Sequence, residues 1–135
     1  MGFRILSHTA DTGIEATAPS FPDLLAELAR GMFACMAVPS VDKPTRSVVI
    51  EVEAGSGDDL VVDALSELLS RSEIDDVLLH EFRVEGSTEM VTVEASGTPL
   101  RDTEQTGPPI KAVTYHDLVV EQRPEGWYAR VYFDV

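Results

Sequence analysis

WYARVYFDV, residues 127–135, alternates in polarity with the period of a β-strand. One face of this strand carries Trp127, Ala129, Val131 and Phe133. Asp134 therefore falls on the opposite face, together with Arg130 and Tyr132. The preceding apolar stretch, Leu118–Gln122, is separated from it by Arg-Pro-Glu-Gly, which predicts a hairpin between the two. The second strand of this predicted hairpin ends with Asp134, next to the last residue, Val135.

A second informative stretch, His8–Ile14 (HTADTGI), lies near the start of the chain. It forms a turn between the predicted strands Phe3–Leu6 and Ile14–Ala18. If the first and last strands are neighbours, Asp11, Asp134 and the terminal carboxylate of Val135 converge. Three oxygen ligands suit a hard cation such as Ca²⁺ or Mg²⁺ better than zinc. Taken singly, Asp11 also fits an aspartate that caps its own turn, and Asp134 fits a solvated terminal acid.

Two amphipathic helices are predicted from apolar residues three and four positions apart. The first begins after Ser20, a good N-cap, and runs to about Ala37. Its apolar face consists of Leu24, Leu25, Leu28, Met32 and Met36. The second covers about Asp59–Arg71, with Asp58 as its expected cap. Its apolar stripe consists of Leu60, Ala64, Leu65, Leu68 and Leu69.

The remaining strands complete an α+β pattern. Ser47–Ala54 is one strand, and Val77–Val84 and Met90–Ala95 pair most simply as a hairpin. Gly97–Pro109 shows no periodicity and is expected to be a long loop. Strand–helix–strand occurs twice, which hints at an internal duplication. We therefore expect a single α+β domain over residues 1–135, with two helices packed on one face of a mostly antiparallel sheet.

The chain of 135 residues carries a formal net charge of −14, from 24 acids and 10 bases. Such a surface repels phosphate backbones, so cations and basic protein surfaces are the expected partners and direct nucleic-acid binding is not. No apolar run is long enough to cross a membrane, and the N-terminus lacks the pattern of a secretory signal. The one cysteine, Cys35, cannot form an internal disulfide. A cytoplasmic location is expected.

Three other polar residues are candidates for a site. His8 is three positions before Asp11 and could orient it or add a ligand. His116 could serve as a general base or as a hydrogen-bond donor to a partner. Lys111 is one of only two lysines, so it either pairs with the carboxylates or reaches into a partner. No serine or cysteine stands in an evident arrangement with a histidine and an acid for nucleophilic catalysis.

Three motifs together resemble the archease family. They are His8–Ile14, the stretch Ile110–Leu118 (IKAVTYHDL) and the ending Ala129–Val135. Their order and spacing match as well, and the resemblance covers essentially the whole chain. In relatives we would expect acidic residues and a histidine in the stretch Gly97–Gln105, where this sequence has Thr98, Arg101 and Gln105.

The resemblance implies an accessory protein and not an enzyme. Archeases assist the GTP-dependent RNA-splicing ligase that joins 2′,3′-cyclic-phosphate and 5′-hydroxyl RNA ends in tRNA splicing and RNA repair, by promoting guanylylation of the ligase and its turnover. The family's metal site maps onto Asp11, Asp134 and Val135. Calcium is the usual ion, with magnesium or manganese as alternatives.

Two other functions stay open at this point. The first is a metal-binding, chaperone-like modulator of a tRNA methyltransferase or another RNA-processing enzyme, which the resemblance also implies. The second is a small metal-dependent hydrolase, which the strongly acidic surface and the lack of a visible nucleophile disfavour.

Overall fold

The computed structural model describes residues 1–7, 12–41 and 43–135. The elements in chain order are β1 (Gly2–Ser7), β2 (Thr12–Ala18), α1 (Phe21–Ala34), β3 (Ala37–Pro39), β4 (Arg46–Glu53), α2 (Gly57–Asp75), β5 (Val77–Gly86), β6 (Met90–Pro99), the 3₁₀ turn η1 (Leu100–Asp102), β7 (Thr103–Gln105), β8 (Ala112–Val113), β9 (Val119–Arg123) and β10 (Gly126–Asp134).

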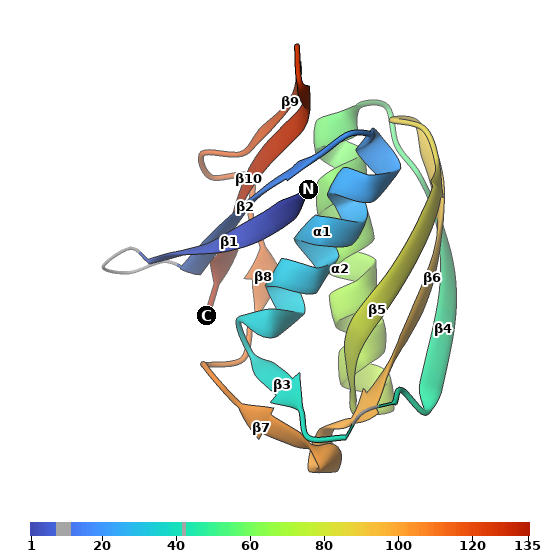
Figure 1. The fold of residues 1–135 in the computed structure, drawn as a ribbon, viewed down its shortest axis with the longest axis vertical. Coiled ribbons are helices and arrows are strands. Elements are labelled where there is room, and N and C mark those ends of the chain that lie inside the picture. The colour runs from blue at the N-terminus through green and yellow to red at the C-terminus, as the bar shows by residue number, and fades with distance from the viewer. Residues whose placement is uncertain (8–11, 42) are drawn as a thin grey trace.

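The strands form antiparallel sheets on two sides of the molecule (Figure 1). One sheet has the order β1-β2-β10-β8, with β9 also paired to β10. The other has the order β4-β6-β5, and β3 pairs with β7 at one end of the molecule. Every pairing within the described residues is antiparallel, so the prediction of a mostly antiparallel α+β fold is confirmed.

The two helices lie between the sheets and cover one face of each (Figure 1). Helix α1 packs on β2 and β5, and α2 packs on β4, β5 and β8. Side chains from both sheets and both helices join in one apolar core. Burial of both predicted helix faces explains this arrangement, since an apolar stripe on a helix is stable only against another element.

Each helix begins at a serine. The Ser20 hydroxyl accepts a hydrogen bond from the Asp23 amide at 3.3 Å, as predicted. The second helix starts earlier than the sequence pattern indicates, because the Ser56 hydroxyl accepts from the Asp59 amide at 3.2 Å. Ser56 is therefore the N-cap, and the prediction of Asp58 in that role was wrong.

The stretch predicted as a long loop is partly ordered into regular structure. Strand β6 continues to Pro99, η1 follows, and β7 pairs with β3. The strands that follow the two helices pair differently: β5 joins the sheet of β4, whereas β3 pairs with β7. The strand–helix–strand repeat thus does not extend to the sheet pairing. Neither helix in the described part of the chain combines the length and apolar character needed to span a bilayer.

Candidate functional site

The sheet brings the start of β2 beside the end of β10. Thr12, the first described residue after position 11, pairs with Phe133, and Ser7 at the end of β1 pairs with Thr12. The antiparallel register explains this, because the first residue of one strand meets the last residue of its neighbour. The last strand, β10, pairs with β2, which separates it from the first strand, β1.

Asp134 and Val135 lie at this edge with their side chains exposed to solvent. The Asp134 carbonyl accepts a hydrogen bond from the Lys111 amide at 2.7 Å, and Asp134 pairs with Ala112 of β8. Within the described part of the chain, the Asp134 carboxylate has neither a hydrogen bond nor an ion pair, and the same holds for the Lys111 ammonium. Lys111 therefore does not neutralise Asp134 through its side chain.

Asp11 and His8, the other residues predicted at this site, lie outside the described residues. Among residues 1–7, 12–41 and 43–135, no group of three or more His, Cys, Asp or Glu side chains is placed to hold a metal ion. The exposed Asp134 carboxylate is a hard oxygen donor of the kind that calcium and magnesium prefer.

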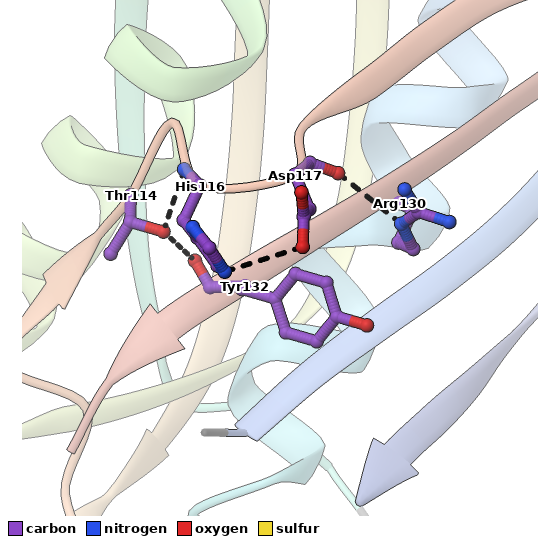
Figure 2. A network of polar contacts seen from close by, with 5 residues as sticks. All are labelled: Thr114, His116, Asp117, Arg130 and Tyr132. Carbon is purple, nitrogen blue, oxygen red and sulfur yellow. Dashed lines mark hydrogen bonds and ion pairs between the residues drawn. The ribbon is translucent and has the colours of Figure 1, made fainter. Parts of the chain in front are cut away.

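A short loop, Thr114–Leu118, stands out from β10 between β8 and β9. These two strands both pair with β10 and lie one after the other along it. The amide and the hydroxyl of Thr114 both donate to the Tyr132 carbonyl, at 3.1 and 3.0 Å. At the other end of the loop, Arg130 Nε donates to the Asp117 carbonyl at 3.2 Å (Figure 2). The loop is therefore tied to β10 at both ends.

His116 is the middle residue of this loop and is exposed. Its Nε2 lies 3.2 Å from Asp117 Oδ2, and its backbone amide donates to the Thr114 hydroxyl at 3.3 Å (Figure 2). The imidazole centroid lies 6.2 Å from that of Tyr132. The carboxylate of Asp117 orients the imidazole beside the ring of Tyr132.

Tyr132 is a part of the site that the sequence reasoning did not single out. Its side chain is only 8% exposed and covers Gly13 on the neighbouring strand. A Cβ at position 13 would lie 2.5 Å from Tyr132 Cδ1, so only glycine leaves room for the ring. The alternation in residues 127–135 already placed Tyr132 and Arg130 with Asp134, and that signal could have identified them.

The loop is also attached to α2 through Tyr115. Its hydroxyl donates to Asp59 Oδ1 at 2.7 Å. This hydrogen bond, followed by partial desolvation and the charges of Asp59 and Asp63, raises the pKa of Tyr115 to about 12. The phenol therefore stays protonated at neutral pH and holds the loop against the first turn of the helix.

Two of the residues by which this chain departs from the expected family pattern, Thr98 and Gln105, have structural partners. Thr98 is fully buried, and its hydroxyl shares a hydrogen bond of 2.8 Å with His80 Nε2. Gln105 donates to the Gly107 carbonyl at 2.9 Å. His80 and Thr98 thus satisfy each other at a β-bulge between Leu79 and Glu81. Neither is available to extend a metal site.

Two solved structures share this fold. The solution structure of Methanobacterium thermoautotrophicum protein 1598 superposes with a TM-score of 0.83 at 23% identity, covering 99% of each chain. The 2.0 Å crystal structure of a Thermotoga maritima protein, described as an archease and possible chaperone, gives a TM-score of 0.70 at 21% identity, covering 96% of this chain and 94% of that one.

Sequence comparison reaches the same group of proteins. Residues 3–135 match the family described as the Archease protein family (MTH1598/TM1083). Protein archease of Methanopyrus kandleri is 32% identical over 140 residues, covering 100% of both chains. Protein archease of Pyrococcus abyssi is also 32% identical, covering 95% of this chain and 94% of its own. This chain therefore belongs to the archease family.

Proposed function

We propose that this protein is an accessory factor of an RNA-splicing ligase, which promotes guanylylation of the ligase and supports its turnover. In this proposal a cation, calcium or else magnesium or manganese, is held by Asp11, Asp134 and the Val135 carboxylate. The protein presents this edge to the ligase near its nucleotide pocket. The net charge of −14 favours contact with the ligase and its metal ions over contact with RNA.

The observation that carries the proposal is the register of β2 against β10. Thr12 pairs with Phe133, so the residues that directly follow Asp11 and directly precede Asp134 are partners across the sheet. Asp134 is exposed and has no ion pair or side-chain hydrogen bond with the rest of the described chain. A carboxylate that is neither buried nor paired can ligate a cation without first losing a protein partner.

The donor set fits a hard divalent cation. Both groups at the described edge are carboxylates, and Asp11 would supply a third. A bound divalent cation would neutralise charge on phosphate oxygens at the contact with the ligase. The chain's own contribution is to hold the two ends of the site through β2 and β10 and to keep Asp134 in solvent.

His116 and Lys111 flank this edge and are proposed to face the partner. His116 is exposed and is oriented by Asp117. The Lys111 amide is fixed by the Asp134 carbonyl, and the Lys111 ammonium forms no ion pair with any described carboxylate. A donor on each side of an acidic site suits recognition of a nucleotide-binding pocket on another protein.

The test is the rate of ligase guanylylation with and without this protein, measured with labelled GTP. Asp134→Asn removes one ligand charge with little change in shape, and stimulation is expected to fall by at least about tenfold. Asp11→Asn is expected to act in the same way. Glu51→Gln, an exposed carboxylate of β4 on the other sheet, is the matched control and should keep full stimulation.

Two outcomes would overturn the proposal. Absence of stimulation by the wild-type protein would remove the ligase as its partner. Full stimulation by both aspartate variants would show that the cation is not the active element. A chain extended past Val135 by three residues isolates the third ligand, because the extension displaces the terminal carboxylate, and unchanged calcium affinity would take Val135 out of the site.

A chaperone-like role is the second candidate, because the similar Thermotoga maritima protein is described as a possible chaperone. In this reading the protein modulates a tRNA methyltransferase or another RNA-processing enzyme. Suppression of aggregation of the methyltransferase on heating, at equal strength for wild type and Asp134→Asn, would favour this candidate. If Asp134→Asn lost both the suppression of aggregation and the stimulation of ligase guanylylation, the ligase would be favoured as the partner.

A further inference from the structure

A pocket of about 420 Å³ opens at the end of the molecule opposite the first turn of α2. Its lining comes mainly from the last turns of α2, the β3–β7 pair and the chain before β8. Figure 1 shows these elements together at one end of the molecule. The apolar lining includes Met36, Leu69, Leu78, Leu100, Pro109 and Ile110. Its size and lining fall in the range of pockets that take an apolar group.

The walls of the pocket are held in place without a ligand. The Met36 carbonyl accepts from the amides of Thr106 and Gly107, at 2.8 and 3.3 Å, and the Ile110 amide lies 3.3 Å from the Met36 sulfur. The Thr106 hydroxyl donates to the Ala34 carbonyl at 3.1 Å. A Cβ at Gly107 would lie 2.4 Å from the Cys35 carbonyl oxygen, so the chain passes as close as a glycine permits. The cavity is therefore preformed.

Leu100 makes the pocket open to a partner. Its side chain is 44% exposed although it lines the pocket, and the Leu100 amide is fixed by the Asp76 carbonyl at 2.9 Å. An apolar side chain held half in solvent at the mouth of an apolar cavity gains burial when another apolar group arrives.

The charge at the mouth is negative. Glu73 is exposed and is the charged member among the described residues that line the pocket. It lies in the last turn of α2, where the helix dipole already favours cations, and no basic residue occupies that turn. Asp75 and Asp76 follow after Ile74. None of the carboxylates of Glu73, Asp75 and Asp76 forms an ion pair within the described chain. Lys111 lines a smaller neighbouring depression that shares Leu69 and Glu73.

From the pocket and its charged mouth, we infer that this end of the protein is a docking site for a basic segment of a partner protein. One aliphatic side chain of the segment fills the cavity, and the lysine or arginine next to it lies against Glu73 and the carboxyl end of α2. Carboxylates that crowd the negative end of a helix are unfavourable on their own, and an incoming cation relieves that repulsion.

The charge argues against other occupants. A fatty acid or another anionic apolar molecule would bring a second negative charge to Glu73. A second copy of this chain would bring a net charge of −14 to the same surface. A basic segment satisfies both the apolar cavity and the acidic mouth.

Three capped peptides of equal length test the inference by titration into the ¹⁵N-labelled full-length protein, followed by NMR. The first has one leucine between lysines, the second replaces that leucine with serine, and the third replaces the lysines with glutamates. We expect the first to shift the amides of Met36, Gly107 and Ile110 saturably. The other two should bind at least about tenfold more weakly, which corresponds to about 1.4 kcal/mol each.

Variants of the protein test separately the charge of Glu73 and the apolar contact of Leu100. Glu73→Gln should weaken the first peptide several-fold, whereas Glu67→Gln, an exposed carboxylate on the same helix, should not. Leu100→Ser should weaken it about tenfold, whereas Val49→Ser, at a side chain 58% exposed on β4, should not. Both positions are exposed, so the core stays intact.

Several results would overturn the inference. Equal binding of the serine peptide would remove the cavity from the interaction, and shifts confined to other surfaces would move it elsewhere. Absence of saturable binding up to a few millimolar, tighter binding of octanoate than of the leucine peptide, or dimerisation through the same residues would each exclude a basic partner segment. None of the residues that line the pocket belongs to the proposed cation site, so Asp134→Asn should leave peptide affinity unchanged.

Discussion

Gly13→Ala tests whether the packing between β2 and β10 organises the candidate site. The added methyl group would lie 2.5 and 2.6 Å from two carbons of the Tyr132 ring and 3.1 Å from the Val131 carbonyl oxygen. Gly13 does not adopt a left-handed backbone conformation, so the substitution introduces a steric conflict and no backbone strain. Overpacking of this kind costs about 1–3 kcal/mol.

The ring has little room to yield, because Tyr132 is only 8% exposed. We therefore expect Gly13→Ala to lower the free energy of unfolding by about 2 kcal/mol, measured by urea denaturation followed by circular dichroism. Because the Tyr132 ring lies 6.2 Å from His116, the imidazole resonances of His116 should shift in the NMR spectrum. Gly2→Ala is the control, since a Cβ there meets nothing within 4 Å. Its effect should stay within about 0.5 kcal/mol.

A double-mutant cycle separates the ring from the rest of the environment. Tyr132→Ala removes the ring that the new methyl group would strike. In that background, Gly13→Ala should cost less than about 1 kcal/mol, which leaves a coupling energy of at least about 1 kcal/mol. Equal costs in the two backgrounds, or an unchanged His116 spectrum in the single variant, would refute the reasoning.

Two further predictions concern groups whose pKa is displaced. Burial raises the pKa of the Cys35 thiol from 9.0 to about 11, so at pH 8 its thiolate fraction is about 100-fold lower than that of an ordinary thiol. Alkylation by iodoacetamide should slow accordingly and recover in urea; rapid alkylation of the folded protein would contradict it. The pKa of Tyr115 is raised to about 12 by its hydrogen bond to Asp59, and that of Tyr128 is raised by desolvation and by Glu15. Asp59→Asn should shift the Tyr115 step of an ultraviolet titration to lower pH and leave the Tyr128 step in place, and an unshifted step would show that the hydrogen bond is absent.

Periodicity was sufficient for the parts of the fold that local sequence determines. The apolar stripe of α1 predicted its buried leucines, and the alternation in β10 predicted the burial of Ala129, Val131 and Phe133, because a helix or strand of this length presents one face to the core. The burial of Tyr132 on the opposite face of β10 was not predicted. The short connection between β5 and β6 then predicted that these two strands pair antiparallel, as a hairpin. In these elements the periodic placement of apolar residues determines both which side chains are buried and whether a helix or a strand forms.

The region from Gly97 to Pro109 shows where this reasoning ends. β7 covers only Thr103–Gln105, which is too short for any alternation to be recognised. It is a strand because it pairs with Ala37–Pro39, more than sixty positions earlier in the chain. The pocket beside it has the same origin, since its walls come from α2, β3 and the chain before β8. Non-local pairing of this kind leaves no local signal.

The candidate site could be predicted from the sequence only in part. Arg130, Tyr132 and Asp134 were placed on one face by alternation alone. The Lys111 amide reaches the Asp134 carbonyl because β8 pairs with β10. A strand of two residues is too short for its sequence pattern to predict that pairing. Tyr115 likewise reaches Asp59 over a separation of 56 positions.

The position of the site depends on the register between β2 and β10, and the Gly13–Tyr132 contact is what makes that register specific. A slip by one residue would turn every side chain of β2 to the opposite face, because side chains alternate along a strand. Ile14 and Ala16 would then leave the core for solvent, and the Tyr132 ring would meet a side chain in place of Gly13. The apolar alternation thus excludes odd slips. The glycine excludes a slip by two, which would set Glu15 or Asp11, depending on its direction, opposite Tyr132 in place of Gly13. The pairing of Thr12 with Phe133 is therefore the one that both constraints allow, and the proposal of a cation site at this edge rests on it.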